Sequence, residues 1–377
     1  MNTVCVQLAA AIVARSGPRH PADAVLRETL RQQRGLSASH AREVARLVFG
    51  WFRWCGWLEP TDGMERQFLE ADALATRFRE SPATFSEDEL ALAVPDWIRE
   101  EMEVSSGWLR SLQGEPRLWL RAKQGQATTL AQRLGGCRIS DEFPDAVEYL
   151  GREDLFRSAE FHAGEFELQD IASQAVGLLC SPQPGEKWWD ACAGEGGKTL
   201  HLSELMKNRG LIWASDRAMW RLQKLRLRAA RAHCFNYRFA VWCGAPKLPT
   251  RTTFDGVLVD APCSGVGTWQ RNPHARWELT PSDVCSLAEI QKRLLSNASA
   301  AVKPGGKLIY AVCTLTHVET VKVVEAFGQR HQDFIPLCFE LGGRQSHGGT
   351  MFLWPQELGG NGMFIGAWQR NRPSPSD

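Results

Sequence analysis

The sequence contains no long uninterrupted apolar segment and almost no excess of charge. No stretch approaches the roughly 18 consecutive apolar residues that a membrane-spanning helix needs. The formal net charge is only +1, so attraction to a polyanion such as RNA has to come from local patches. The segment 1–15 has no basic leader and is interrupted by Gln7, so we interpret it as an amphipathic helix rather than a secretory signal.

The sequence also lacks the cysteine and histidine patterns of disulfide frameworks and zinc sites. Its 11 cysteines are an odd number, scattered from Cys5 to Cys338 without a CxxC pair. Scattered cysteines in a large chain fit a reducing, cytoplasmic location. The absence of a zinc-finger spacing argues against a metal. Most of these cysteines are expected to be small buried side chains.

The pattern of residues changes twice along the 377 positions, which exceed what one hydrophobic core usually organises. Residues 1–94 show helical periodicity with almost no strand signal, which predicts an all-helical domain. Residues 95–161 combine a strand at 118–122 with a helix at 124–134, and they predict a small α+β domain. In residues 162–377 strands and helices alternate, which is typical of an α/β fold with a parallel sheet. We expect a monomer.

The predicted strands of this third domain end next to its polar motifs. The strands are 187–190, 210–215, 237–242, 256–260 and 307–312, and the helices between them are 198–207, 220–233 and 281–301. Ligands of open parallel sheets bind at the carboxyl ends of the strands, so we expect the functional residues there. The polar segment 369–377 is expected to fray.

The first of these strands leads into DACAGEGGKT, residues 190–199. Glycines let the backbone approach a ligand closely, and a helix start offers free N–H groups. A phosphate-binding loop is disfavoured because it needs a glycine where Cys192 stands, and GEGG lacks the GxGxxG spacing of a dinucleotide fold. The second strand ends at Asp216, where an acidic side chain can accept hydrogen bonds from both ribose hydroxyls. This suits adenosine without a pyrophosphate, although Asp216 could instead cap the helix near Ala218.

Two cysteines follow apolar strands of the same sheet. FDGVLVDAPCSG delivers Asp260 and Cys263 to the carboxyl edge, and the next strand delivers Cys313 in YAVCTLTHVET. A lone cysteine at a strand end is usually a buried small residue. Each of these thiols, however, stands in a polar loop after an apolar strand, so we expect both to face one crevice.

Such a pair suits methylation of cytosine carbon-5. This carbon becomes reactive only after a thiolate adds to carbon-6. The addition shifts electron density to nitrogen-3, where Asp260 could donate a hydrogen bond or a proton. A base must then remove the carbon-5 proton, and a second cysteine is a reasonable helper.

Three motifs resemble those of the Sun family of RNA cytosine-5 methyltransferases, which includes a bacterial rRNA enzyme and nucleolar relatives. DACAGEGGKT resembles the cofactor motif, DAPCSGVGT the first cysteine motif and VCTLTHVE the second, while QDIASQ and NGMFIGAW are weaker matches. The resemblance implies a Rossmann-like domain that binds S-adenosylmethionine. It further implies that Cys313 is the nucleophile, that Cys263 assists product release and that Asp260 contacts the cytosine.

The expected cofactor-binding residues lie in the glycine loop and at the strand ends beside it: Cys192, Ala193, Gly194, Glu195, Gly196, Gly197, Lys198, Asp216, Arg221 and Asp260. The helical start, with LVFGWFRW at 47–54, resembles the NusB-like RNA-binding domain of the bacterial rRNA enzyme. That likeness favours rRNA over tRNA as the substrate.

The sequence departs from the family pattern at three places. Glu195 stands where the family usually has proline. Cys243 occupies the place of an aspartate that recognises the adenine amino group, so this contact passes to the backbone or to another side chain. Val312 and Thr320 replace the usual threonine and asparagine around the second cysteine motif. None of these changes removes a reacting atom.

Cations that could hold RNA occur in two segments. The loop after Cys263 carries Arg271, His274 and Arg276 beside tryptophans, and such combinations bind phosphates and stack bases. We predict these three residues to bind RNA, whose target base must be single-stranded or flipped out. The helix after Asp216 is also basic, but a solvated face explains it at least as well.

Other functions stay open on the sequence alone. The chain could methylate tRNA, DNA or a small molecule. It could also be a non-catalytic RNA-binding protein of ribosome assembly that keeps the fold, although the intact cysteine pair speaks against this.

Overall fold

A computed structural model describes residues 1–33 and 35–372, and the chain forms two compact units. The first comprises Met1–Pro116 and Gly265–Asp283, and the second comprises Arg117–Ser264 and Val284–Asp377. This division differs from the predicted boundaries after residues 94 and 161. Residues 117–161 join the second unit, and residues 265–283 leave the sheet domain to join the first.

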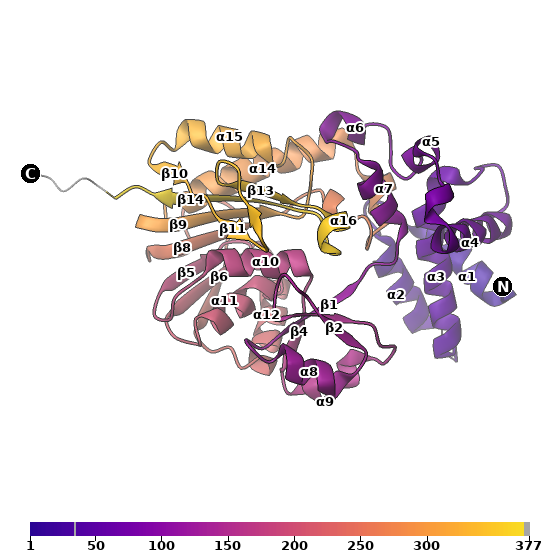
Figure 1. Cartoon of the computed structure of the whole chain (residues 1–377), viewed down its shortest axis with the longest axis horizontal. Coiled ribbons are helices and arrows are strands. Elements are labelled where there is room, and N and C mark those ends of the chain that lie inside the picture. The colour runs from indigo at the N-terminus through magenta and orange to yellow at the C-terminus, as the bar shows by residue number, and fades with distance from the viewer. Residues whose placement is uncertain (34, 373–377) are drawn as a thin grey trace, which may run out of the picture. The chain divides into compact units, whose positions relative to one another are not determined.

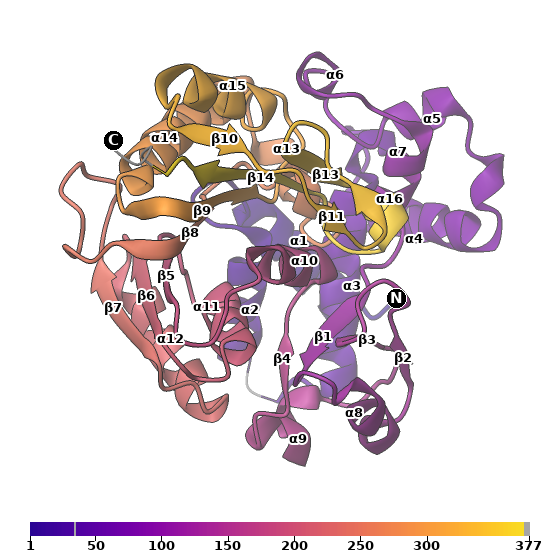
Figure 2. The ribbon, with the colours of Figure 1, turned by 60° about the vertical axis from the view of Figure 1, so that its left-hand side comes forward.

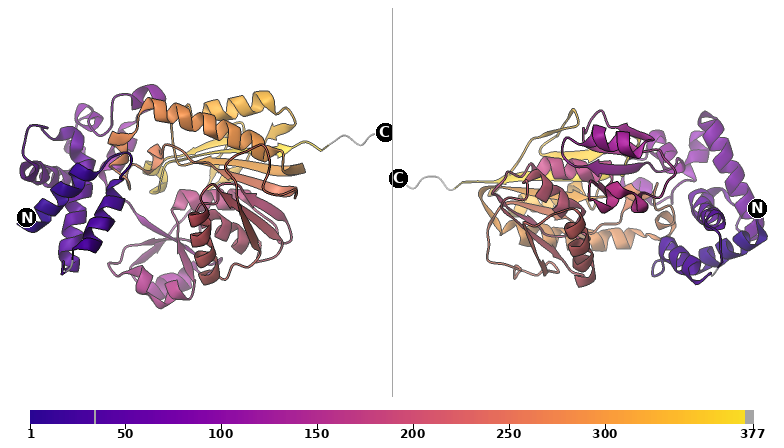
Figure 3. Two further views of the ribbon diagram at one scale, coloured as in Figure 1. Left: turned by 180° about the vertical axis from the view of Figure 1, so that it is seen from behind. Right: turned by 90° about the horizontal axis from the view of Figure 1, so that it is seen from below.

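The first unit is all helical, as expected for residues 1–94. Its longer helices are α1 (Thr3–Arg15), α2 (Ala22–Gln32), α3 (Ala38–Trp54) and α4 (Met64–Glu80), followed by α5 (Glu87–Ala91), α6 (Ile98–Glu101) and α7 (Ser106–Gln113), with the 3-10 turns η1 (Cys55–Trp57) and η2 (Pro82–Thr84). Residues 265–283 add η4 (Val266–Thr268) and α13 (Ala275–Glu278). The helices of this unit lie side by side (Figure 3). The apolar faces of α1 to α4 bury Ile12, Val44 and Phe68 in one core.

The second unit begins with a four-stranded antiparallel sheet in the order β2-β3-β1-β4. Its strands are β1 (Leu118–Ala122), β2 (Cys137–Ile139), β3 (Ala146–Tyr149) and β4 (Phe166–Leu168), accompanied by α8 (Ala127–Leu134), η3 (Leu155–Arg157) and α9 (Ala159–His162). Leu120, Leu130 and Val147 lie in its core. The predicted strand at 118–122 is therefore correct, and it belongs to a sheet within the larger unit.

An eight-stranded mixed sheet forms the main part of the second unit, in the order β10-β14-β9-β8-β5-β6-β7, with β13 paired to β14. Its strands are β5 (Lys187–Asp190), β6 (Leu211–Asp216), β7 (Tyr237–Val241), β8 (Phe254–Asp260), β9 (Val302–Val312), β10 (Phe334–Pro336), β13 (Thr350–Leu353) and β14 (Met363–Arg370). The five strands β5 to β9 are parallel, and β14 runs antiparallel to β9.

Helices cover both faces of this sheet (Figures 1 and 2). On one face lie α10 (Ile171–Cys180), α11 (Gly197–Leu205) and α12 (Met219–Arg231), and on the other lie α14 (Pro281–Ser299) and α15 (Val321–Arg330). The hairpin of β11 (Glu340–Leu341) and β12 (Arg344–Gln345) and the helix α16 (Pro355–Leu358) complete the unit. This is the α/β arrangement that the alternation of strands and helices predicted, and it is Rossmann-like, as the family resemblance implied.

Because helices pack on both faces, the central strands are continuous apolar runs rather than alternating ones. Val257, Leu258 and Val259 of β8 are all fully buried. The parallel register of β8 and β9 places Asp260 opposite Ala311, so the residues that follow these two strands meet at one edge.

The far end of the chain differs in part from its prediction. The polar segment 369–377 was expected to fray, but Gln369 and Arg370 are still part of β14. Residues 373–377 lie outside the described residues. No described helix is long and apolar enough to cross a membrane.

Candidate active site

The two predicted thiols come together at the carboxyl edge of the sheet. Cys263 follows β8 and Cys313 follows β9, and their sulfur atoms are 3.3 Å apart. Both residues are only partly buried, whereas a structural cysteine is usually enclosed. The backbone bond from the Ala261 N–H to the Ala311 carbonyl, 3.0 Å, continues the sheet up to this point.

A buried carboxylate, Glu319, connects the loops on which the thiols stand. It accepts hydrogen bonds from Ser264, which follows Cys263, and from Thr314, which follows Cys313. Glu319 has no exposed surface. The sequence places it in VCTLTHVE, but nothing in a sequence pattern indicates that a glutamate there faces inward.

Asp260 and Lys198 form an ion pair next to the cysteines. The Lys198 Nζ lies 2.7 Å from the Asp260 Oδ2, and the lysine side chain is 8% exposed against 30% for the aspartate. Burial acts to lower the pKa of Lys198, but the neighbouring Asp260 raises it overall. Lys198 thus stays an ammonium ion that holds Asp260 in place.

The predicted cofactor loop links β5 to α11 through two glycines with left-handed backbone. Gly194 has a φ of 55° and Gly196 a φ of 90°. A β-carbon on Gly196 would lie 2.7 Å from the Leu225 Cγ, so a side chain would also collide there. Next to them, Glu195 pairs with Lys224 of α12 at 2.7 Å. This ion pair anchors the loop at the position where the family usually has proline.

Asp216 at the end of β6 holds the predicted cofactor loop through a hydrogen bond. Its Oδ2 accepts from the Gly194 N–H at 3.1 Å, and its Oδ1 accepts from the Ala218 N–H at 2.8 Å. Arg221 lies 3.7 Å from the same carboxylate. The bond to Ala218 is the one that the capping alternative expected, while the bond to Gly194 ties Asp216 to the predicted cofactor loop.

Asp190, the first residue of DACAGEGGKT, is fully buried, and only one of its two carboxylate oxygens has a hydrogen-bond partner among the described residues. Its Oδ2 accepts from the Thr199 hydroxyl at 2.6 Å, while its Oδ1 has no hydrogen-bond partner among the described residues. Burial raises the pKa of Asp190 to about 7. Burial and the charges of Asp190, Asp260 and Asp216 also raise the pKa of the neighbouring Cys192 thiol well above its usual value.

The place of the missing adenine-recognising aspartate lies just beyond β7. Cys243 is exposed there. Its neighbour Trp242 is buried, packs on Trp189 with ring centroids 4.8 Å apart and donates its indole N–H to the Ala245 carbonyl. The tryptophan therefore fixes this turn through packing.

The segment that carries these motifs matches a known protein family. Residues 177–369 match a family model described as 16S rRNA methyltransferase RsmB/F, and the match includes the cofactor loop and both cysteines. This chain belongs to the RsmB/F family. The predicted resemblance to the Sun family is thereby confirmed, and with it S-adenosylmethionine as the methyl donor of the family.

Individual proteins agree with the family match. A probable ribosomal RNA small subunit methyltransferase B of Synechocystis sp. is 37% identical over 293 residues, which are 72% of this chain and 65% of that protein. The chain thus spans less than two thirds of that relative's length. A solved structure of a methyltransferase homologue from Pyrococcus horikoshii, 25% identical, has a TM-score of 0.61 over 70% of this chain and 90% of that one. The structure of PH0851, 22% identical, has the same fold, with a TM-score of 0.75 over 97% of both chains.

The two weaker motif matches of this RsmB/F chain contact each other. Asp170 of QDIASQ caps α10 and also accepts from the Asn361 N–H of the NGMFIGAW segment, at 3.0 and 3.1 Å to its two oxygens. Sequence analysis missed Arg121 of β1, which is 3% exposed and donates to Gln169 and to the Gly197 carbonyl at the start of α11. Arg121 of the small sheet thus holds the start of α11.

The three predicted RNA-binding residues all lie in the first unit, and two of them are buried. Arg276 is fully buried and donates to the carbonyls of Trp269, Ala93 and Leu112, the last at 2.7 Å. His274 is 5% exposed, and burial lowers its pKa. Their burial favours a structural role for both over the predicted contact with RNA.

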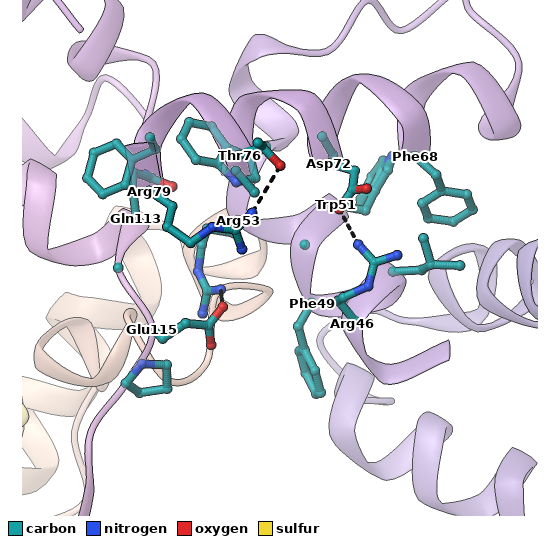
Figure 4. A pocket seen from close by; sticks show the side chains of 18 of the residues that line it. Arg46, Phe49, Trp51, Arg53, Phe68, Asp72, Thr76, Arg79, Gln113 and Glu115 are labelled. Carbon is teal, nitrogen blue, oxygen red and sulfur yellow. Dashed lines mark hydrogen bonds and ion pairs between the residues drawn. The ribbon is translucent and has the colours of Figure 1, made fainter. Parts of the chain in front are cut away.

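Arg271, the third of these residues, lines a cavity of about 830 Å³ in the first unit (Figure 4). The cavity combines cations with aromatic rings. The cations are Arg46, Arg53, Arg79 and Arg271, the acids are Asp72 and Glu115, and the aromatic residues are Phe49, Trp51, Trp54, Phe68 and Phe78. Arg46 pairs with Asp72, and Arg79 donates to the Thr76 hydroxyl at 3.2 Å.

A metal site was not expected. Among residues 1–33 and 35–372 no group of three or more His, Cys, Asp or Glu side chains is arranged to hold a metal ion.

Proposed function

We propose that this chain methylates carbon-5 of a cytosine in rRNA, with S-adenosylmethionine as the donor and Cys313 as a covalent nucleophile. One observation carries the proposal: two partly buried thiols lie 3.3 Å apart at the edge of the sheet where the cofactor loop and Asp260 also end. Family membership supports methyl transfer to rRNA. The cysteine pair supports the choice of carbon-5, since that carbon needs a thiol adduct.

The residues of the loop fit S-adenosylmethionine. A β-carbon on Gly194 would meet no other heavy atom closer than 3.9 Å, so there is open space against the backbone. Asp190 has an oxygen without a partner among the described residues. The negative charges of Asp190, Asp260 and Asp216, added to the effect of burial, raise the pKa of Cys192. Negative charge suits a cofactor that carries a positive sulfonium. In this proposal Asp216 holds the ribose hydroxyls, and residues 193–197 line the rest of the cofactor.

The thiolate of Cys313 opens the reaction by forming a bond to carbon-6. The π electrons of the ring move toward nitrogen-3, which takes a proton that the Lys198 ammonium group passes on through Asp260, and carbon-5 becomes enamine-like. When bound, S-adenosylmethionine supplies the electrophilic methyl group that carbon-5 accepts. We assign Asp260 the contact with the base and Lys198 the task of orienting it.

Cys263 completes the reaction as a base. Its thiolate removes the proton from carbon-5, the electron pair restores the ring double bond, and the sulfur of Cys313 leaves carbon-6. Nitrogen-3 returns its proton through Asp260 to Lys198, which restores the ion pair. Cys313 leaves as the thiolate that begins the next cycle, and Cys263 gives the proton that it has taken up to water.

The cavity of the first unit supplies a second RNA contact in this proposal. Guanidinium groups bind phosphates, and aromatic rings stack unpaired bases. Its four arginines outnumber its two acids. The predicted likeness of this unit to an RNA-binding domain agrees with that assignment.

Transfer of tritium from labelled S-adenosylmethionine tests the function. We expect label in small-subunit rRNA, recovered as 5-methylcytosine after digestion, and none with Cys313→Ala, although this variant should bind the cofactor as the parent does. Transfer RNA and DNA serve as competing substrates. Label in another nucleoside, or full activity of Cys313→Ala, would refute the proposal.

A further inference from the structure

Glu319 accepts hydrogen bonds from both cysteine loops at once. Its Oε1 accepts from the Ser264 N–H at 2.8 Å and from the Gln291 Nε2 at 2.9 Å. Its Oε2 accepts from the hydroxyls of Ser264, Thr314 at 3.0 Å and Thr316 at 2.9 Å. One carboxylate therefore joins the residue after Cys263 to the residue after Cys313.

The surroundings of Glu319 are fixed in turn. The Tyr310 hydroxyl of β9 donates to the Glu319 carbonyl at 2.7 Å and to the Gln291 Oε1 at 3.0 Å. Gln291 of α14 also donates to the Pro262 carbonyl at 2.9 Å, just before Cys263. The network thus reaches from the sheet, through α14, to both sides of the first cysteine.

Burying a carboxylate among neutral donors is costly unless its lone pairs are used. All five donors to Glu319 are neutral N–H or O–H groups, and its side chain is fully buried. An apolar residue would fill this space at a lower cost. We explain the carboxylate by its effect on geometry, since a side chain with two hydrogen-bonding atoms can hold two loops together.

We propose that Glu319 is a positioning residue that sets the distance between the Cys263 and Cys313 thiols. The inference rests on the proposed function, in which the two sulfurs act on adjacent carbons of one ring. A misplacement of about 1 Å can slow a positioned reaction by about 100-fold. Loss of the carboxylate is therefore expected to slow chemistry far more than it weakens binding of the cofactor.

Two substitutions separate the effect of the hydrogen bonds that Glu319 accepts from the two cysteine loops, here called the Glu319 bridge, from an effect on general stability. Glutamine keeps an acceptor for the two N–H donors, and its NH₂ group faces three hydroxyls that can rotate to accept. Glu319→Gln should therefore retain turnover to within about 10-fold, whereas Glu319→Ala should lower kcat at least about 100-fold with little change in KM for S-adenosylmethionine. The matched control is Glu148→Ala, which removes a carboxylate that is 4% exposed and paired with Arg138 in the small sheet.

A second readout does not depend on methyl transfer. Diamide takes up the two electrons and two protons that the thiols lose when they join as a disulfide, and mass spectrometry of the Cys263–Cys313 peptide measures the rate. Thiols 3.3 Å apart should couple quickly in the parent protein and in Glu148→Ala, and at least about 10-fold more slowly in Glu319→Ala.

Methyl transfer and the rate of disulfide formation distinguish a failure of the proposed function from a failure of the inference about Glu319. If the parent protein transfers no methyl group, the proposed function fails, while the disulfide rates still test the bridge. If folded Glu319→Ala turns over and couples its thiols as the parent does, the inference is overturned. Should this variant not fold, Ser264→Ala combined with Thr316→Val removes two of the hydroxyl donors and takes its place, with the same two expectations.

Discussion

Arg276 in the first unit and Glu319 in the second are both charged and both fully buried, yet their partners differ in kind. Arg276 donates to backbone carbonyls of segments that are distant in sequence, including Ala93 and Leu112. Glu319 accepts from residues that stand beside two candidate catalytic thiols. A buried charge marks a place where apolar packing is not enough, and its partners indicate whether it serves the fold or the chemistry.

The difference extends to the regions around these residues. In the first unit residues 265–283 are held by buried polar groups, so substitutions there should lower stability. At the sheet edge of the second unit the two thiols and Asp260 are partly exposed. Substitutions at that edge should lower the rate and leave the fold intact.

Cys263→Ala is the strongest test of the chemical side of this comparison. Without a base for the carbon-5 proton, turnover should fall by about 1,000-fold or more, and a protein–RNA adduct should persist on a denaturing gel. The free energy of unfolding should change by less than about 1 kcal/mol, because the thiol is partly exposed. Cys285→Ala, at an exposed position of α14, is the control. Absence of an adduct while the parent protein is active would remove the release role from Cys263.

Arg276→Met tests the structural side. The substitution leaves four carbonyl oxygens without their donor, and we expect a loss of about 3 kcal/mol in the free energy of unfolding of the first unit. Denaturant titration followed by tryptophan fluorescence measures it. The dissociation constant for S-adenosylmethionine should not change. Arg99→Met, on an exposed face of α6, controls for the loss of charge, and equal stability of the two variants would contradict the structural role.

How well the sequence predicts a residue depends on whether its neighbours are local. The strand 187–190 has the predicted bounds, because apolar runs between turn residues are local signals. The meeting of Cys263 and Cys313 follows from parallel pairing, a general rule of such sheets. The position of Glu319 could not be predicted, since its inward direction depends on a tertiary network that no spacing encodes.

In residues 265–283 the sequence instead predicted exposed side chains that the structure buries. Arg276 and His274 follow a glycine-rich loop and look like exposed cations, because nothing in the local sequence shows that this segment packs with α3 and α7 of the first unit. Arg271 has the same local signal and lines a cavity. Local composition therefore cannot separate a phosphate contact from a buried fold contact.

Asp190 offers a test in which the effect changes with pH. Burial raises its pKa to about 7, so the folded protein binds the Asp190 proton more tightly than the unfolded chain does. The stability that this proton contributes is fully present below the unfolded pKa near 4 and is lost as pH rises through 7. Relative to Asp190→Asn, the parent protein should lose on the order of 2 kcal/mol between pH 5 and pH 8, measured by urea unfolding without cofactor.

Asp255→Asn is the matched control for that experiment. Burial acts to raise the pKa of Asp255, but hydrogen bonds from Lys303 and from the Lys187 N–H lower it overall. Its effect should therefore stay constant between pH 5 and pH 8. If the effects of Asp190→Asn and Asp255→Asn on the free energy of unfolding depend on pH in the same way, Asp190 is ionised from pH 5 to pH 8. Its pKa is then not raised by burial.

Arg79→Glu should have the smallest effect and refines the comparison within the first unit. Arg79 lines the cavity and is exposed, so reversing its charge should leave stability unchanged and raise KM for rRNA by about 5-fold to 10-fold at low salt. The slope of log KM against log salt should fall by about 1, as for one lost phosphate contact. Arg99→Glu, outside the cavity, should do neither. If both variants weaken RNA binding equally, the attraction is spread over the whole helical surface, and the cavity is not the contact.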